Sequence, residues 1–370
     1  LLYGFNGVLA GSVPMAAGLS SSSAVVVASS EALTFMNGLS IQPNDFVDLC
    51  GEGEWFVGTR GGSGDHAAMK FAEKGSIIHM GFHPIKIEAI VPFPPGYMLF
   101  ILQSHQSAKK SENAMQIYNE KVATYEVAQA IIKRRFPQHS SKIVHLRDVN
   151  ADTLGVLPHE AYDILLEIPE RIGRNECLQI VHEEDRKRLE RIFSSHSEPA
   201  GGYEARRVAL YGIAEIGRAR EIPKLLQAGD TTAVGRLMNI SHNGDRVTCQ
   251  NEFGRISYDN SCPNEEIIAL RNRLAAGDFD AALHYQPGGY GCSTPLIDEM
   301  IDLALSIPGV IGAQLSGAGL GGCIMALVKE EFGEFFRKTI TDEFYIKKNL
   351  PPAIEICFPI EGSGVVRLSQ

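Results

Sequence analysis

The chain has little that would connect it with nucleic acid or with a membrane. It carries 34 lysines and arginines against 44 aspartates and glutamates, a formal net charge of −10. It therefore lacks the excess positive charge with which proteins neutralise nucleic-acid phosphates. No apolar run reaches the roughly 20 residues of a membrane-spanning helix, and no signal peptide is evident. We expect neither nucleic acid nor a membrane as a partner.

The chain also lacks a cysteine pattern and an initiator methionine. Its seven cysteines are scattered and odd in number, with no C-x-x-C pair and no His/Cys cluster at zinc spacing. This favours reduced thiols and a cytoplasmic location. The chain begins Leu1-Leu2-Tyr3, so we expect that sequence is missing upstream. The sequence does not indicate an oligomeric state.

A Walker P-loop is absent too, because that motif requires a lysine and the small-residue loop at 14–24 has none. This loop instead leads into an apolar stretch with helical character. A second loop, at 312–323, lies about three hundred residues later and contains five glycines. A small-residue loop before a helix presents free backbone N–H groups and the positive end of the helix dipole. The pair of loops predicts a phosphate site, and hence a nucleotide triphosphate.

The pattern along the rest of the chain predicts a mixture of helices and strands. A third glycine-dense loop, at 54–66, follows two predicted helices. Residues 243–293, rich in glycine, asparagine and proline, read as an insertion. We expect helices at 22–37, 44–51 and 294–307, a mainly helical region at 112–240, and strands at 76–80, 85–91, 97–103, on both sides of the loop within 312–328, and in 353–366.

Several motifs occur together and in one order. Residues 14–23 match P-x-G-x-G-L-S-S-S-A, with Ala16 in place of the first glycine, and residues 59–66 are similar to a loop that ends in G-x-M-D-Q. Further matches are L-R-D-V at 146–149, G-x-L-M-N-x-S-H at 235–242, S-T-P-L at 293–296 and the loop at 312–323. This ordered set resembles the GHMP kinases, and within them the galactokinase branch.

The resemblance implies an α+β fold of two domains, with the active site in the cleft between them. The N-terminal domain would span residues 1–104, incomplete at its start, and the C-terminal domain 105–370, with a possible insertion at 243–293. Galactokinases begin with a sugar-binding segment like G-R-V-N-L-I-G-E-H-T-D-Y-N-G, which has no match here. It would lie upstream of Leu1, so either the chain is a fragment or the protein has lost this segment.

The resemblance also implies roles for particular residues. Asp65 matches the catalytic aspartate. Ser22 and Glu54 match the Mg²⁺ ligands, and Glu52 is the fallback for Glu54. Gly62, Asp65 and Tyr118 would contact the substrate. ATP would be bound by Pro14, Ala17, Gly18, Leu19, Ser20, Ser21, Ser22, Ser23, Gly317 and Gly319.

Each of these residues has an ordinary structural alternative. A serine-rich run can cap a helix, Asp65 can cap the next helix, Glu54 can lie on the surface, and Tyr118 can place its ring in the core. Taken together, they predict an ATP- and Mg²⁺-dependent sugar 1-kinase for a galactose-like sugar, with N-acetylgalactosamine, arabinose and a uronic acid left open. A non-catalytic sensor of sugar and ATP is the alternative. A kinase of a non-sugar alcohol is a weaker one.

Overall fold

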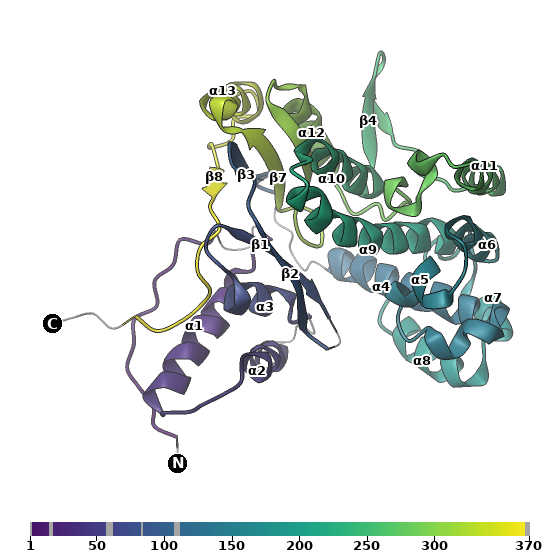
Figure 1. The fold of residues 1–370 in the computed structure, drawn as a ribbon, viewed down its shortest axis with the longest axis horizontal. Coiled ribbons are helices and arrows are strands. Elements are labelled where there is room, and N and C mark those ends of the chain that lie inside the picture. Colours follow the sequence, from purple (N-terminus) through teal and green to yellow (C-terminus); the bar gives the residue numbers. More distant parts are fainter. Residues whose placement is uncertain (1, 15–17, 57–61, 83, 107–111, 367–370) are drawn as a thin grey trace.

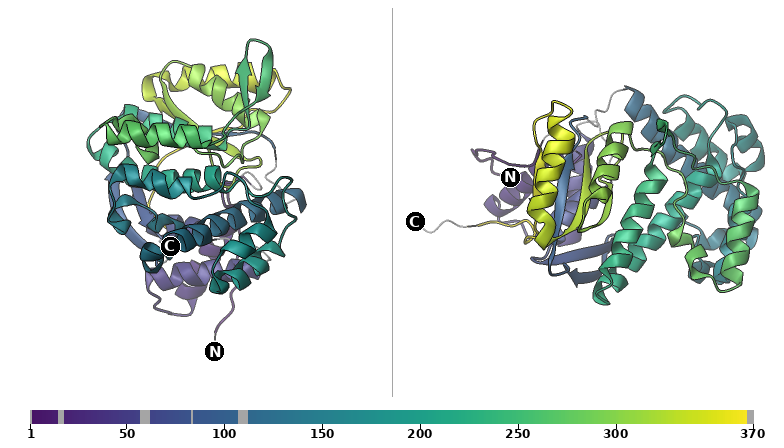
Figure 2. Two further views of the ribbon diagram at one scale, coloured as in Figure 1. Left: turned by 90° about the vertical axis from the view of Figure 1, so that its right-hand side faces the viewer. Right: turned by 90° about the horizontal axis from the view of Figure 1, so that it is seen from above.

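The computed structural model describes residues 2–14, 18–56, 62–82, 84–106 and 112–366. Figure 1 shows three parts: a small group of helices with a β-hairpin, a four-stranded sheet with its covering helices, and a large bundle of helices. Mixed helices and sheets, as the sequence predicted, make up the fold. Figure 2 shows the same parts from two further directions.

The first part contains the loop at 14–24 and the helix that follows it. Its elements are α1 (Ser21–Met36), α2 (Pro43–Trp55), α3 (Gly64–Phe71) and the antiparallel hairpin of β1 (Ser76–Gly81) and β2 (Lys86–Pro92). Pro43 stands at the first position of α2, where its missing N–H costs nothing. Val27, Phe46 and Cys50 form a small core between α1 and α2.

The second part is an antiparallel sheet with the strand order β6-β7-β3-β8. Its strands are β3 (Tyr97–Gln103), β6 (Val310–Leu315), β7 (Cys323–Lys329) and β8 (Ile354–Cys357). The inner strand β3 is almost entirely apolar because both of its faces are covered. Helices α12 (Pro295–Ser306) and α13 (Gly333–Ile340) share a core with the sheet. The domain boundary predicted at residue 104 stays a prediction, although β3, which precedes it, pairs with strands from the end of the chain.

The third part is a helical bundle built around two long helices, α4 (Glu112–Arg135) and α9 (Ala205–Gln227). Apolar residues of both helices share the largest core of the protein with their neighbours. The other helices of this part are α5 (Ala151–Leu154), α6 (Ala161–Leu166), α7 (Arg174–Ile180), α8 (Glu183–Phe193) and α11 (Asn264–Ala275). Helix α10 (Thr231–Asp245) joins the bundle to the sheet through β6.

The predicted insertion at 243–293 holds the hairpin of β4 (Thr248–Asn251) and β5 (Gly254–Ser257) and helix α11, while its first residues complete α10. That it is an insertion stays a prediction. The strands expected across 353–366 are wrong beyond β8. After Cys357 the chain leaves the sheet and its N–H groups donate to carbonyls near the end of α3 instead.

Helix α10 and strand β6 touch through backbone atoms. A Cβ placed on Gly235 would lie 2.1 Å from the carbonyl oxygen of Ile311, and one on Gly312 would lie 2.6 Å from the Cα of Gly235. No side chain fits between atoms at such distances. The close approach therefore requires glycine on both elements.

We expect Gly235→Ala to lower the free energy of unfolding by about 2 kcal/mol or more, because the added methyl group must push α10 away from β6. The matched control is Gly53→Ala in α2, where nothing lies within 4 Å of the added Cβ. That change should leave stability equal or higher, since alanine favours a helix. Urea unfolding of both variants checks this. Equal stability of the two variants would contradict the backbone contact.

Asp245, at the end of α10, is buried beneath the segment that supports the loop at 312–323. The Tyr211 hydroxyl donates to its Oδ2 at 2.9 Å. The backbone N–H of Ser293 donates to the Asp245 carbonyl at 2.9 Å, and that of Leu320 donates to the Cys292 carbonyl at 2.6 Å. Burial raises the pKa of the Asp245 carboxyl to about 7, although the hydrogen bond from Tyr211 lowers it. The folded protein thus holds a proton here that the unfolded chain gives up.

This proton makes stability depend on pH. The unfolded carboxyl ionises near pH 4, whereas the folded one ionises near pH 7. The stabilising contribution of Asp245 to the free energy of unfolding is therefore fully present below about pH 4 and is lost as the pH rises to 7. We expect Asp245→Asn to become more stable relative to the original chain as the pH increases from 5 to 7.5. Urea midpoints across this range test it. A difference that is constant with pH would show that the carboxyl is ionised throughout.

Candidate active site

The two small-residue loops meet in the structure, although about three hundred residues separate them. A Cβ placed on Gly18 would lie 3.8 Å from the Gly322 Cα and 3.9 Å from the Ser316 carbonyl oxygen. One on Gly317 would lie 3.3 Å from the Gly18 carbonyl oxygen. Gly18 and Gly317 both have positive φ angles, of 75° and 77°, which glycine adopts without strain. The structure thus brings the two predicted loops into one place.

The loop before α1 reaches the aspartate that the sequence singled out. Ser20 precedes α1 with a φ of 54°, and its side chain does not cap the helix. The hydroxyl instead donates to Oδ2 of Asp65 at 2.5 Å. Asp65 stands in the first turn of α3, where a negative charge is favoured by the helix dipole. One hydrogen bond therefore joins the start of α1 to the start of α3.

Ser20 and Asp65 line a cavity of about 970 Å³. Gly18, Leu19 and Ser316 contribute to its wall from the two loops, and the inner face of α1 contributes Ala24 and further residues. The C-terminal residues 360–365 also line it. The cavity is large enough for a substrate, and Asp65 is an exposed carboxylate within it.

Glu54, near the end of α2, lies beside α1 and α3. Its Oε2 accepts a hydrogen bond from the Ser23 hydroxyl at 3.0 Å and lies 3.1 Å from Nε2 of His66. That second contact does not meet hydrogen-bond geometry, and neither ring nitrogen of His66 has another partner among the described residues. Ser22, the predicted metal ligand, is exposed, and Ser21 is half-buried in the first turn of α1. The structure therefore brings Ser23, rather than Ser22, to Glu54.

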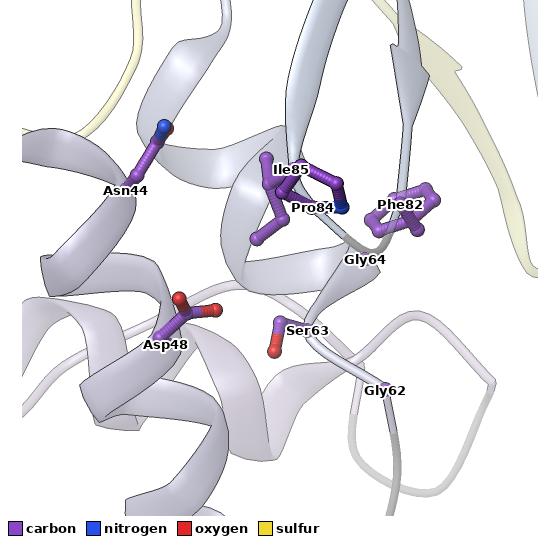
Figure 3. A pocket seen from close by; sticks show the side chains of 8 residues that line it. All are labelled: Asn44, Asp48, Gly62, Ser63, Gly64, Phe82, Pro84 and Ile85. Atoms are coloured by element: carbon purple, nitrogen blue, oxygen red, sulfur yellow. The ribbon is translucent and has the colours of Figure 1, made fainter.

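Gly62 belongs to the short segment that leads into α3. A cavity of about 410 Å³ lies beside this segment, between α2 and the turn that joins β1 to β2. Figure 3 shows Asp48 of α2 and Ser63 in its lower part, beneath Pro84 and Ile85. Asp65 is not among the residues that line it. This cavity thus lies beside the segment that leads to Asp65, and not at Asp65 itself.

The remaining predicted residues are placed less directly. Leu19 packs on Ile101 and Cys323, Pro14 is half-buried, and Ala17 lies outside the described residues. A Cβ on Gly319 would lie 2.2 Å from the Cys292 carbonyl oxygen, so packing alone accounts for that glycine. Tyr118 lies on α4 with 43% of its surface exposed, and in the described part of the chain no hydrogen bond joins it to Asp65.

Sequence reasoning missed three partners in this site. It did not assign the Ser20 hydroxyl to Asp65, the Ser23 hydroxyl to Glu54, or the C-terminal residues to the cavity wall. No local pattern in the sequence distinguished these partners. These contacts depend on how α1, α2 and α3 pack.

Other kinds of site find no support in the described residues. They contain no group of three or more His, Cys, Asp and Glu side chains arranged for a metal ion. None of the seven cysteines, all of which lie in the described ranges, forms a disulfide bond. None of the described helices is both long and apolar enough to cross a membrane.

Two models of one protein family match parts of this chain. Residues 3–73 match the model of the GHMP kinases N-terminal domain, and residues 265–345 match that of the GHMP kinases C-terminal region. The first match covers the loop before α1, Glu54 and Asp65. The second covers the loop at 312–323.

Similar proteins span nearly the whole chain. A galactokinase of Roseiflexus sp. (strain RS-1) is 26% identical over 99% of this chain and 71% of its own length. One of Clostridium beijerinckii is 25% identical over 97% of this chain and 70% of its own. The structure of Lactococcus lactis galactokinase complexed with galactose matches with a TM-score of 0.58 at 23% identity, over 97% of this chain and 69% of that one. The two matched GHMP kinase domain models, together with galactokinases that are similar over nearly the whole of this chain, support the GHMP kinase family and within it the galactokinase branch.

Proposed function

We propose that this sugar kinase transfers the γ-phosphate of ATP to the anomeric hydroxyl of a galactose-like sugar, with Mg²⁺ as its metal. The observation that carries the proposal is the 2.5 Å hydrogen bond between Ser20 and Asp65. It holds a carboxylate at the end of a loop suited to bind phosphate. A phosphate donor and an acceptor hydroxyl could therefore meet there.

Binding of the triphosphate would rely on backbone rather than on lysine. The first N–H groups of α1, a helix of 16 residues, have no partner within the helix, and they point toward the loop. The net charge of −10 makes this local positive potential necessary. Gly317 supports the loop by backbone contact. The roles proposed for Pro14, Ala17 and Gly319 rest on the family pattern alone.

Asp65 would orient the acceptor hydroxyl and take its proton. The sugar oxygen forms a bond to the γ-phosphorus, the bond from that phosphorus to the bridging oxygen of ADP breaks, and the hydroxyl proton passes to the Asp65 carboxylate. The Ser20 hydroxyl, which donates to the same carboxylate, keeps it in place. Gly62 and Tyr118 would contact the sugar.

The donor atoms around Glu54 suit Mg²⁺, which prefers hard oxygen ligands. Glu54 would hold the ion with a serine hydroxyl, Ser22 by the family pattern or Ser23 by the contact in this structure. When bound, the ion neutralises charge on the phosphates during transfer. His66, which lies 3.1 Å from the same carboxylate, would help to keep Glu54 in place.

The galactose-like acceptor is supported by the names of the similar proteins, which are galactokinases. N-acetylgalactosamine, arabinose and galacturonate remain candidates. The odd, scattered set of cysteines in the sequence is the basis for proposing a cytoplasmic location. The function is tested by measuring ADP formed from ATP in the presence of Mg²⁺, with galactose and with each of these three sugars as acceptor. Binding of both ligands without turnover would favour a sensor instead.

We expect Asp65→Asn to lower kcat on the best sugar by about 100-fold or more, because an amide cannot accept the proton. The matched control is Asp45→Asn, an exposed residue in the first turn of α2, which should keep kcat within about twofold. Both variants should bind ATP as the original chain does. An Asp65→Asn variant with full activity would exclude Asp65 as the base.

Replacing Glu54 should change the Mg²⁺ requirement of the enzyme more than it changes the stability of the fold. We expect Glu54→Gln to raise the Mg²⁺ concentration for half-maximal activity about tenfold or more, since an amide is a poorer ligand than a carboxylate. Mn²⁺ binding in the presence of ATP, measured by electron paramagnetic resonance, gives a readout without turnover. Glu52→Gln, two residues earlier and exposed, is the control. A metal requirement that moves only in the Glu52 variant would reassign the ligand.

A further inference from the structure

The last described segment returns from the sheet to the helices that carry the candidate site. Figure 1 shows the yellow chain leave β8 and run down to α1 and α3, and the second view of Figure 2 shows the same return. We call residues 359–363 the C-terminal strap. No function assigned above to the site uses it.

The strap supplies partners to the end of α3. The Ser363 N–H donates to the Met69 carbonyl at 2.7 Å, and the Gly362 N–H donates to the Ala72 carbonyl at 2.8 Å. The last carbonyls of a helix have no partner within it. Helix α3 has eight residues, too few to be stable without tertiary contacts. The strap therefore completes a helix whose first turn carries Asp65.

Side chains also connect the strap and α3 with α1. Ser363 Oγ donates to Oε1 of Glu31 at 2.7 Å, and Lys70 Nζ donates to the same oxygen at 2.5 Å. Lys70 Nζ also lies 4.6 Å from the centre of the Phe46 ring. The side chains of Glu31 and Lys70 are only 14% and 20% exposed, so water screens their attraction less than at an open surface. Side chains of α1, α2, α3 and the strap are therefore in contact here.

Helices α1 and α3 are thus joined at two places. Ser20 and Asp65 join their first turns, and Glu31, Lys70 and Ser363 join them further along. A shift of α3 along its axis would break both connections together. The strap also lies in the wall of the cavity that holds Asp65.

We propose that Gly362 and Ser363 are positioning residues, which act through α3 to hold Asp65 in place for phosphoryl transfer. The proposal rests on the function proposed above. Gly362 is the more critical of the two, because a Cβ there would lie 2.5 Å from the Lys70 carbonyl oxygen. Any side chain at 362 must push the strap away from α3.

The test compares Gly362→Val with Gly364→Val. The two positions lie two residues apart, but nothing lies within 4 Å of a Cβ on Gly364. For both variants we would measure hydrogen exchange of the α3 amides and kcat per folded molecule on the best sugar. We expect faster exchange in α3 and a kcat lower by about tenfold or more in the Gly362 variant, since small misplacements of catalytic groups are costly. The Gly364 variant should keep the α3 exchange of the original chain. Because Gly364 also lines the cavity that contains Asp65, the control for kcat is Gly11→Val, an exposed position with nothing within 4 Å of the added Cβ.

Each outcome decides the proposal. Faster exchange with unchanged kcat, or unchanged exchange, would overturn it. If the original chain has no turnover on any sugar, the proposed function fails, and a positioning role in that reaction fails with it, while the exchange data would still show whether the strap holds α3. Should Gly362→Val not fold, Ser363→Ala replaces it, with Ser363→Thr as the variant that keeps the hydroxyl. A kcat that falls in Ser363→Ala and is restored in Ser363→Thr would support the proposal, whereas equal kcat values of the two variants would overturn it.

Discussion

Contact between the backbones of two distant loops is the constraint on which the rest of this structure depends. Gly18 and Gly317 touch without side chains between them, in a conformation that suits glycine. The first loop opens α1, and the second connects β6 to β7. Their contact therefore sets where the first part of the chain lies against the sheet. A side chain at Gly317 would crowd the Gly18 carbonyl oxygen at 3.3 Å, and a residue other than glycine at either position would have to adopt a positive φ.

The sheet makes this contact possible. Strand β3 pairs with β7 along its whole length, so that Gln103 faces Cys323 at the edge where the second loop begins. The Ser104 N–H then donates to the Gly322 carbonyl at 2.9 Å, and its hydroxyl donates to the same oxygen at 2.7 Å. A register shifted by one residue would exchange the side chains of β3 between its two faces, so that Phe100 and Leu102 would leave the core they share with α12 and α13. The packing of the sheet core thus fixes the loop as well.

Most elements of the fold could be predicted from the sequence because their patterns are local. The strand at 97–103 has the observed bounds, and the helix at 22–37 and the strands at 76–80 and 85–91 differ from the observed elements by at most one residue at each end. The closing strands were wrong beyond Cys357, because the N–H groups of the strap find partners on α3, which no local pattern reveals. The site follows the same rule. The two loops and Asp65 carried signals, whereas the partners of Asp65 and Glu54 depend on packing.

The run of four serines shows why such a limit exists. Successive residues of a helix point about 100° apart, so of Ser21, Ser22 and Ser23 only some can face α2. Four identical residues contain no signal that distinguishes them. The rotation of α1 about its axis decides the question, and the packing of Val27 against Phe46 and Cys50 of α2 sets that rotation. Ser23 lies one turn before Val27 on the same face, so it is buried against Glu54, while Ser22 is exposed. The packing of α1 on α2 therefore selects the serine that reaches Glu54.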